Sequence, residues 1–123
     1  MLCRYKKANE KIAMGLLSFM PEHKDVKKLQ ETICQYNSDP NWQLYLWKQD
    51  DDYIGLVGVE IKDNKWIVRH ISVDPSHRGE GVGVEMIRKL YEMDVCGSIA
   101  ADELTEPFIQ KCLTMLEEAD EEV

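Results

Sequence analysis

Residues 66–83 read WIVRHISVDPSHRGEGVG: an apolar run, an Asp-Pro turn and then a cluster of glycines. Glycine is favoured where the backbone takes a positive φ angle or passes close to a ligand. A helix that begins at such glycines offers unpaired N–H groups, and these groups attract anions. The stretch therefore predicts a strand, a turn and a helix whose first amides hold a phosphate group.

The residues after this turn predict an amphipathic helix. Charged residues occupy one side, and apolar residues recur at helical spacing on the other. A helix of this kind buries its apolar stripe against a sheet. The predicted stripe contains Val82, Met86, Ile87, Leu90 and Tyr91.

The spacing of the glycines separates this loop from two common phosphate-binding loops. A P-loop is excluded, because no Lys-Ser or Lys-Thr pair follows residues 78–83. A dinucleotide-binding loop is disfavoured, because Met86 stands where its third glycine is needed, although Asp102 is placed like that motif's acidic residue. A turn that binds no ligand stays open as the structural alternative.

Bulk properties limit the possible functions. The chain has 123 residues, of which 44% are hydrophobic, and a formal net charge of −8. This length predicts one domain over residues 1–123, with an acidic tail at 117–123 that is expected to fray. The negative charge argues against nucleic acid or an anionic membrane as a partner, because both need a basic face. A cationic small molecule is favoured.

The cysteines predict a reduced, cytoplasmic protein. They form no C-x-x-C pair, and no histidine stands at a spacing that would complete a zinc site, so no metal is expected. They are expected to be mostly buried thiols. The apolar run at 12–20 is too short to cross a membrane. The cysteines are Cys3, Cys34, Cys96 and Cys112.

Hydrophobic periodicity and turn residues predict the element order β-α-α-β-β-β-α-β-α. The short joints at 49–52 and 63–64 predict that the three central strands form an antiparallel meander. The predicted strands are 2–6, 43–48, 53–61, 65–73 and 95–101, and the predicted helices are 10–20, 26–36, 82–91 and one that begins near Thr105.

The pattern Arg78-x-x-Gly81-x-Gly83 after a strand and a Pro turn resembles the GNAT superfamily of acyl-CoA-dependent N-acetyltransferases, whose signature is [QR]-x-x-G-x-[GA]. The element order is similar to the GNAT core over nearly the whole chain. The resemblance implies an α/β (α+β) fold around a mixed, mostly antiparallel sheet that lacks the usual last two strands. Residues 4–7, 11–20 and 69–73 also resemble the RibT proteins, which are acetyltransferase-like proteins of bacterial riboflavin operons.

The resemblance also implies a co-substrate, acetyl-CoA. In the family, the end of the strand 65–73 binds the pantetheine arm through its backbone, as an added strand would be bound. The glycine loop and the helix dipole then hold the pyrophosphate. The implied cofactor-binding residues are Ile71, Ser72, Val73, Arg78, Gly79, Glu80, Gly81, Val82 and Gly83.

Acetyl transfer to an amine needs a base that takes the amine proton. In the family the amine attacks directly, so no nucleophile is required of Cys96 or Cys112. The candidate bases are Glu60 and His70, of which His70 is expected to titrate in the right pH range. Their structural alternatives are a solvated strand carboxylate and a hydrogen-bonded sheet histidine.

The chain departs from the family at two side chains. Ile109 stands where many members have a Tyr that protonates the leaving thiolate, and Glu103 stands in place of an Asn after the fifth strand.

The resemblance as a whole implies transfer of an acetyl group to the primary amine of a small metabolite, linked to riboflavin metabolism. The alternative is a CoA-binding regulatory module with little catalysis. The missing strands leave 95–101 at a sheet edge, which predicts a homodimer.

Overall fold

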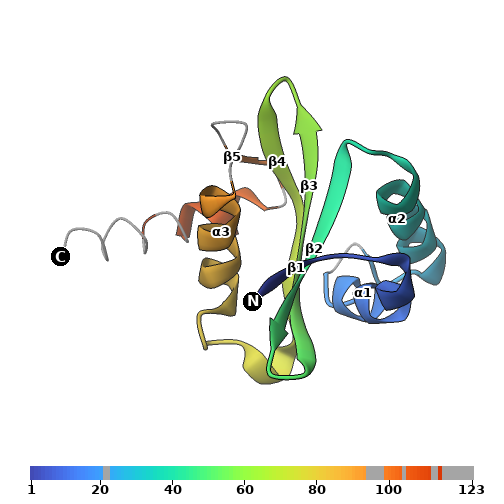
Figure 1. Ribbon diagram of the computed structural model, residues 1–123, viewed down its shortest axis with the longest axis horizontal. Helices are drawn as coiled ribbons and strands as arrows, with labels where there is room; N and C mark the ends of the chain where they lie inside the picture. Colours follow the sequence, from blue (N-terminus) through green and yellow to red (C-terminus); the bar gives the residue numbers. More distant parts are fainter. Residues whose placement is uncertain (21–22, 94–98, 104, 112–113, 115–123) are drawn as a thin grey trace.

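The computed structural model describes residues 1–20, 23–93, 99–103, 105–111 and 114. A five-stranded sheet of order β1-β2-β3-β4-β5 runs through the centre of the molecule (Figure 1). The strands are β1 (Leu2–Arg4), β2 (Trp42–Gln49), β3 (Asp52–Lys62), β4 (Lys65–Val73) and β5 (Ile99–Ala101). The helices are η1 (Lys7–Asn9), α1 (Glu10–Leu17), α2 (Val26–Ser38), η3 (Pro75–His77) and α3 (Val82–Glu92), and residues 106–111 and 114 are also helical.

The sheet combines an antiparallel meander with one parallel pair. β1 to β4 pair antiparallel in chain order, while β5 pairs parallel to β4. The hairpin between β3 and β4 turns at Asp63 and Asn64, which both have positive φ angles of 52° and 63°. Such angles suit the two-residue turns that match the twist of a hairpin. The predicted mixed, mostly antiparallel sheet is therefore confirmed.

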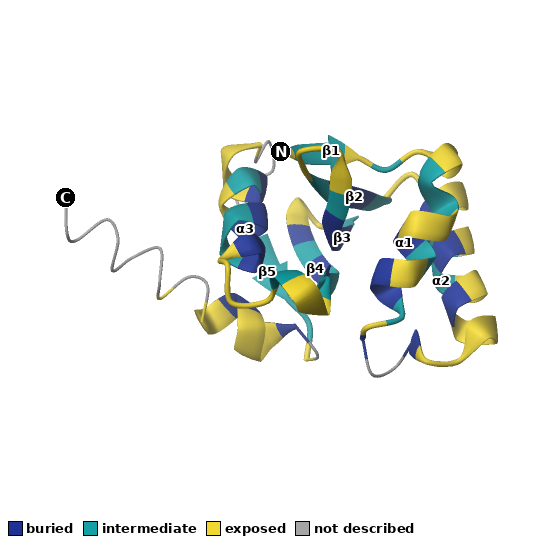
Figure 2. Ribbon diagram, turned by 90° about the horizontal axis from the view of Figure 1, so that it is seen from below, coloured by how far each residue is buried: buried dark blue, intermediate teal, exposed yellow. Residues whose placement is uncertain are grey.

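Helices cover both faces of the sheet. α1 and α2 lie on one face, and α3 lies on the other beside the helix at 106–111 (Figure 1). The buried side chains of these helices point toward the sheet between them (Figure 2). Because both faces are covered, β3 is buried without interruption over residues 54–59. The fold thus has two hydrophobic cores, one on each side of β3 and β4.

Two glycines allow close packing around β4 and α3. A β-carbon at Gly58 on β3 would overlap the hydroxyl of Tyr36 from α2. A β-carbon at Gly83 would overlap the ring of Phe108, so the start of α3 can lie directly against the helix at 106–111. Gly58 thus lets α2 lie close to β3, and Gly83 lets the last helix lie close to α3.

Most predicted elements are confirmed, and several details are wrong. Tyr91 was predicted in the buried stripe of its helix but is exposed at the end of α3. The helix predicted at 10–20 begins at Glu10, where a 3-10 turn leads into it, but α1 ends at Leu17. Cys34 is exposed rather than buried. The predicted residues 95–98 of the fifth strand and the tail at 117–123 lie outside the described residues.

No helix within the described ranges is long and apolar enough to cross a membrane.

Candidate active site

A β-bulge in β4 places two consecutive side chains on one face of the sheet. The register shifts so that Gly58 pairs with His70 while the next residue of β3, Val59, pairs with Val68. Arg69 is therefore the extra residue. A bulge interrupts the alternation of a strand, and here both Arg69 and His70 line a pocket on the α2 side. Regular alternation would have sent them to opposite faces.

Beyond this bulge, β5 no longer pairs with β4. β5 pairs with β4 only through residues 66–68, and then the chain leaves the sheet at Asp102. Thr105, at the start of the last helix, donates its hydroxyl proton to the Val68 carbonyl at 2.7 Å and so fixes the point of departure. Among the described strands, none pairs with the β5-facing edge of residues 69–73.

The backbone N–H and carbonyl groups of residues 71–74 point alternately toward β3 and toward the free edge. Asp74 N–H donates to the Ile54 carbonyl at 2.8 Å, so its backbone faces β3. By alternation, the backbone of Ser72 also faces β3, and those of Ile71 and Val73 face the free edge. Ser72 is held further by its hydroxyl, which donates to the Leu16 carbonyl at 2.7 Å. Among the described residues, no strand pairs with the backbone groups of Ile71 and Val73 on this edge, although the Val73 carbonyl accepts a hydrogen bond from Arg78 Nε.

The glycine loop leads from this edge into α3. Gly79 and Gly81 have φ angles of 85° and 81°, and no atom lies within 4 Å of a β-carbon built on either residue. Gly81 occupies the N-cap of α3, where no side chain caps the helix. Arg78 Nε lies 3.4 Å from the Val73 carbonyl, which places this cation between the strand edge and the loop.

This arrangement fits the pyrophosphate of a CoA molecule. The open amides at the start of α3 and the positive end of its dipole attract an anion. The remaining predicted residues have other contacts: the Glu80 carboxylate contacts His77 Nδ1 at 2.8 Å, and Gly83 faces Phe108. The free edge of β4 ends beside the loop, so one extended ligand can contact both.

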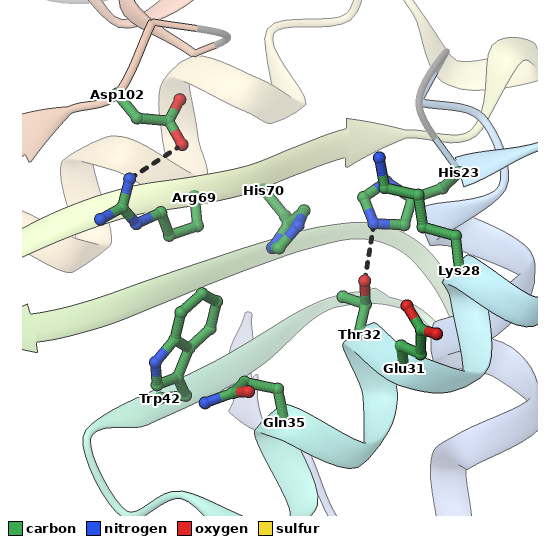
Figure 3. Close-up of a pocket in the computed structure, with 9 residues that line it drawn as sticks. All are labelled: His23, Lys28, Glu31, Thr32, Gln35, Trp42, Arg69, His70 and Asp102. Atoms are coloured by element: carbon green, nitrogen blue, oxygen red, sulfur yellow. Dashed lines mark hydrogen bonds and ion pairs between the residues drawn. The ribbon is translucent and has the colours of Figure 1, made fainter.

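The pocket on the α2 side has a volume of about 390 Å³ (Figure 3). His70 lies at its centre, with Arg69 and His23 on either side and Asp102 across from Trp42. Side chains from α2, β4 and the segment after β5 meet here. The lining residues are His23, Lys28, Glu31, Thr32, Gln35, Trp42, Arg69, His70 and Asp102.

His70 is held within an aromatic cluster. Its Nδ1 lies 2.5 Å from the hydroxyl of Tyr36. The ring of His23 packs edge-on against it, with 4.9 Å between ring centroids. Burial, with a further contribution from His23, lowers the pKa of His70 from 6.5 to about 3. The expectation that His70 titrates near neutral pH is therefore wrong, because the site removes its ring from water.

Arg69 joins two carboxylates at the mouth of this pocket. Its Nη2 and Nε donate to Glu60 Oε1 at 2.7 and 3.0 Å, and its Nη1 lies 3.4 Å from Asp102 Oδ2. Glu60 thus lies on the same side of the sheet as His70, but it carries a paired charge. Asp102 also accepts the backbone N–H of Thr105 at 3.0 Å. One cation and two anions leave this group with a net negative charge that suits an ammonium ion.

Several residues in and beside the pocket were not predicted as site residues. Tyr36 was predicted only as part of the helix 26–36, and His23 and Trp42 were given no role. Gly58 was the available signal, because a glycine inside a strand often marks a close approach of another group. Ile109 is buried in the core, while Glu103 is exposed and its neighbour Asp102 reaches the pocket. In the described part of the chain, no cluster of side chains could hold a metal ion.

Comparisons with known proteins agree with this geometry. Residues 10–97 match the family model described as the acetyltransferase (GNAT) family. A Bacillus methanolicus protein named as an uncharacterized N-acetyltransferase in the lysA 3′ region is 50% identical over 113 residues, or 91% of this chain and 94% of that protein.

Solved structures share the fold. The complex of AAC(6')-Iy with the bisubstrate analogue CoA-S-monomethyl-acetylneamine has a TM-score of 0.71 at 15% identity, covering 94% of this chain and 87% of the other. The aminoglycoside 6′-N-acetyltransferase AAC(6')-IG from Acinetobacter haemolyticus has a TM-score of 0.71 at 19% identity, covering 92% and 86%.

Proposed function

Because the chain belongs to the GNAT family of acetyltransferases, we propose that it acetylates the primary amine of a small molecule that binds in the α2-side pocket. It is an N-acetyltransferase with acetyl-CoA as co-substrate. The proposal rests on the position of residues 70–73. His70 lines the pocket, while the backbones of Ile71 and Val73 face the free edge. An amine and a thioester bound at these two places meet at one strand.

The co-substrate site uses the backbone more than side chains. Ile71 offers its N–H and carbonyl groups and Val73 offers its N–H group to the pantetheine amides, and Ser72 keeps the strand in register through its bond to α1. The amides at 79–83 and the Arg78 guanidinium hold the pyrophosphate. The acetyl group arrives as a thioester, and the backbone N–H near Val73 is placed to stabilise the developing oxyanion.

The amine proton leaves through a carboxylate in this proposal. Of the two predicted bases, His70 has a pKa of about 3 and is too weakly basic to accept the proton efficiently at neutral pH. Glu60 uses Oε1 to bind Arg69, and its Oε2 has no hydrogen-bond partner among the described residues. Glu60 therefore receives the proton through a water molecule, and His70 acts in binding the amine.

In this proposal, water protonates the leaving thiolate. Ile109 replaces the family's Tyr and is buried, so it has no role in proton transfer. Ordinary thiols have a pKa near 8.5, so a thiolate needs less help in leaving than an alkoxide does. The expected consequence is slow turnover.

The test combines two measurements on the full chain. Release of free CoA thiol is followed with acetyl-CoA and a panel of primary amines, and CoA affinity is measured by calorimetry. Arg78→Ala should weaken binding of CoA more than binding of dephosphorylated pantetheine, while Lys62→Ala, an exposed cation at the end of β3, should change neither. CoA binding without thiol release for any amine would instead favour the regulatory module.

The proposal also includes a class of acceptor and a homodimer. The resemblance of residues 4–7, 11–20 and 69–73 to RibT supports an acceptor from riboflavin metabolism, in the cytoplasm, so the amine panel includes riboflavin precursors. β5 is a terminal strand of the sheet, which supports a homodimer that covers this edge. Sedimentation that shows only a 14.3 kDa species at tens of micromolar would contradict the dimer.

A further inference from the structure

The hydrogen bond between Tyr36 and His70 lies under the floor of the pocket. Tyr36 is only 7% exposed, and its hydroxyl occupies the space that Gly58 leaves open on β3. Gly58 is also the cross-strand partner of His70. The hydroxyl and the imidazole are thus held together by the strand pairing and by the packing of α2 on the sheet.

The direction of this hydrogen bond follows from the protons available. Burial raises the pKa of Tyr36 well above 10, so its hydroxyl keeps its proton. A buried O–H group needs an acceptor. Among the described residues, the acceptor within hydrogen-bond distance is His70 Nδ1. If Nδ1 accepts, it carries no proton, and the proton of the neutral imidazole must be on Nε2.

The opposite direction leaves a buried group unsatisfied. If Nδ1–H donated to the phenol oxygen, the Tyr36 proton would need a second acceptor, and no described residue supplies one. The cost of an unpaired buried donor is about 1–3 kcal/mol, enough to favour one tautomer strongly. The lowered pKa of His70 keeps the ring neutral.

We propose that Tyr36 fixes His70 as the Nε2–H tautomer, so that His70 presents a hydrogen-bond donor to the molecule in the pocket and not a proton acceptor. This inference rests on the proposed function and refines its acceptor class. The amine that binds here carries an oxygen or nitrogen lone pair close to its amino group, and that lone pair accepts the Nε2 proton. Tyr36 is a positioning residue, since it acts through His70.

The surrounding rings oppose a flip of the imidazole. His23 packs edge-on against His70 at an interplanar angle of 75°, and Trp42 lies on its other side at 6.4 Å between centroids. His23 is itself only 2% exposed, and its Nε2 contacts the Thr32 hydroxyl at 2.8 Å. A flipped ring would lose its bond to Tyr36.

The direct test is NMR of the full chain labelled with ¹⁵N in its histidines, because the two tautomers give different patterns of nitrogen shifts and ring-proton correlations. His70 should show the Nε2–H pattern in the unmodified protein, and Tyr36→Phe should convert it to a mixture. His77, which lies on the surface turn before α3, serves as the internal control and should be unchanged. A wild-type His70 in the Nδ1–H form would overturn the proposal, whatever the enzyme's activity.

A kinetic comparison tests the donor role with the amine that gives the fastest thiol release. His70→Gln retains a side-chain N–H donor, whereas His70→Glu supplies a base without a donor. We expect Gln to raise KM for the amine only a few-fold and Glu to raise it at least tenfold. The reverse order would show that a base is needed at this position. CoA affinity, measured in both variants, separates this result from a failure of the co-substrate site.

Discussion

The glycine loop and the α2-side pocket lie at the two sides of β4 and are built in opposite ways. The loop is one run of residues, 78–83, of which 78–81 are exposed, and in our proposal it acts through backbone amides and a helix dipole. The pocket takes its side chains from α2 and the segment before it, from β2 and β4, and from the segment after β5, and those near its floor are largely buried. A site made from backbone depends on local conformation. A site made from side chains depends on how distant elements pack.

The two regions also differ in how they treat charge. In our proposal, the loop attracts an anion with the partial charges of its amides and with one exposed guanidinium, Arg78. The pocket pairs Arg69 with Glu60 and Asp102 and keeps His70 neutral beside them. Changing one full charge should therefore affect function more in the pocket than in the loop.

The largest expected effect comes from Glu60→Gln. The amide oxygen can still accept from Arg69, so the fold is retained while the charge and the basicity are lost. We expect kcat to fall by about 10²–10⁴-fold, the usual loss for a general base. Steady-state thiol release measures this change.

Glu31→Gln provides the matched control, because Glu31 is a carboxylate that lines the pocket and forms no ion pair with Arg69. It should raise KM for a cationic amine and leave kcat nearly unchanged. Full activity in Glu60→Gln would identify bulk water as the base.

The same contrast explains what the sequence could predict. The loop, the element order and the pairing of β2 to β4 depend on glycines, turn residues and periodicity, which act locally. The pocket depends on a one-residue bulge at Arg69, which turns His70 to the α2 side, and on Tyr36 reaching across to Gly58. No local pattern specifies either contact. The pKa of His70 was mispredicted for the same reason, since burial arises only in the folded chain.

The second largest effect is expected in the loop, from Gly81→Val. A β-branched residue is strained at a φ of 81°, and its side chain would occupy the open space in front of the amides. CoA binding should weaken by about 1–3 kcal/mol, the cost of a lost anion contact. Calorimetry measures the affinity directly.

Gly15→Val is the control, because Gly15 lies on α1 in open space and without a positive φ angle. It should leave CoA affinity unaltered. An unchanged affinity in Gly81→Val would show that the pyrophosphate does not bind at this loop.

A smaller effect concerns stability against pH and reports on the pocket alone. His70 has a pKa of about 3 in the folded state against 6.5 ordinarily, so below pH 6.5 the unfolded chain binds more protons. The stabilisation is complete above pH 6.5 and is lost as the pH falls toward 3. Each pH unit in that window removes about 1.4 kcal/mol, so about 2 kcal/mol is lost by pH 5.

Denaturant titrations between pH 7 and 5 measure this slope. The charged neighbours His23, Lys28, Arg69 and Asp102 also contribute to the field at His70, so the comparison is made against His70→Gln. That variant should have a flatter profile over the same range. Equal slopes in the two proteins would show that His70 is not responsible for the pH dependence.

The smallest effect is expected from the cysteines, and it tests whether the two regions act on one another directly. If the amine in the pocket attacks the thioester at the β4 edge, no third group carries the acetyl group between them. Cys3 and Cys34 are free thiols outside the pocket, and direct attack requires nothing of Cys96 or Cys112. Replacing all four by Ser should therefore change kcat by no more than a few-fold. A variant that folds, binds CoA and releases no thiol would instead indicate an acyl-enzyme, and restoring each cysteine in turn would identify the residue that carries it.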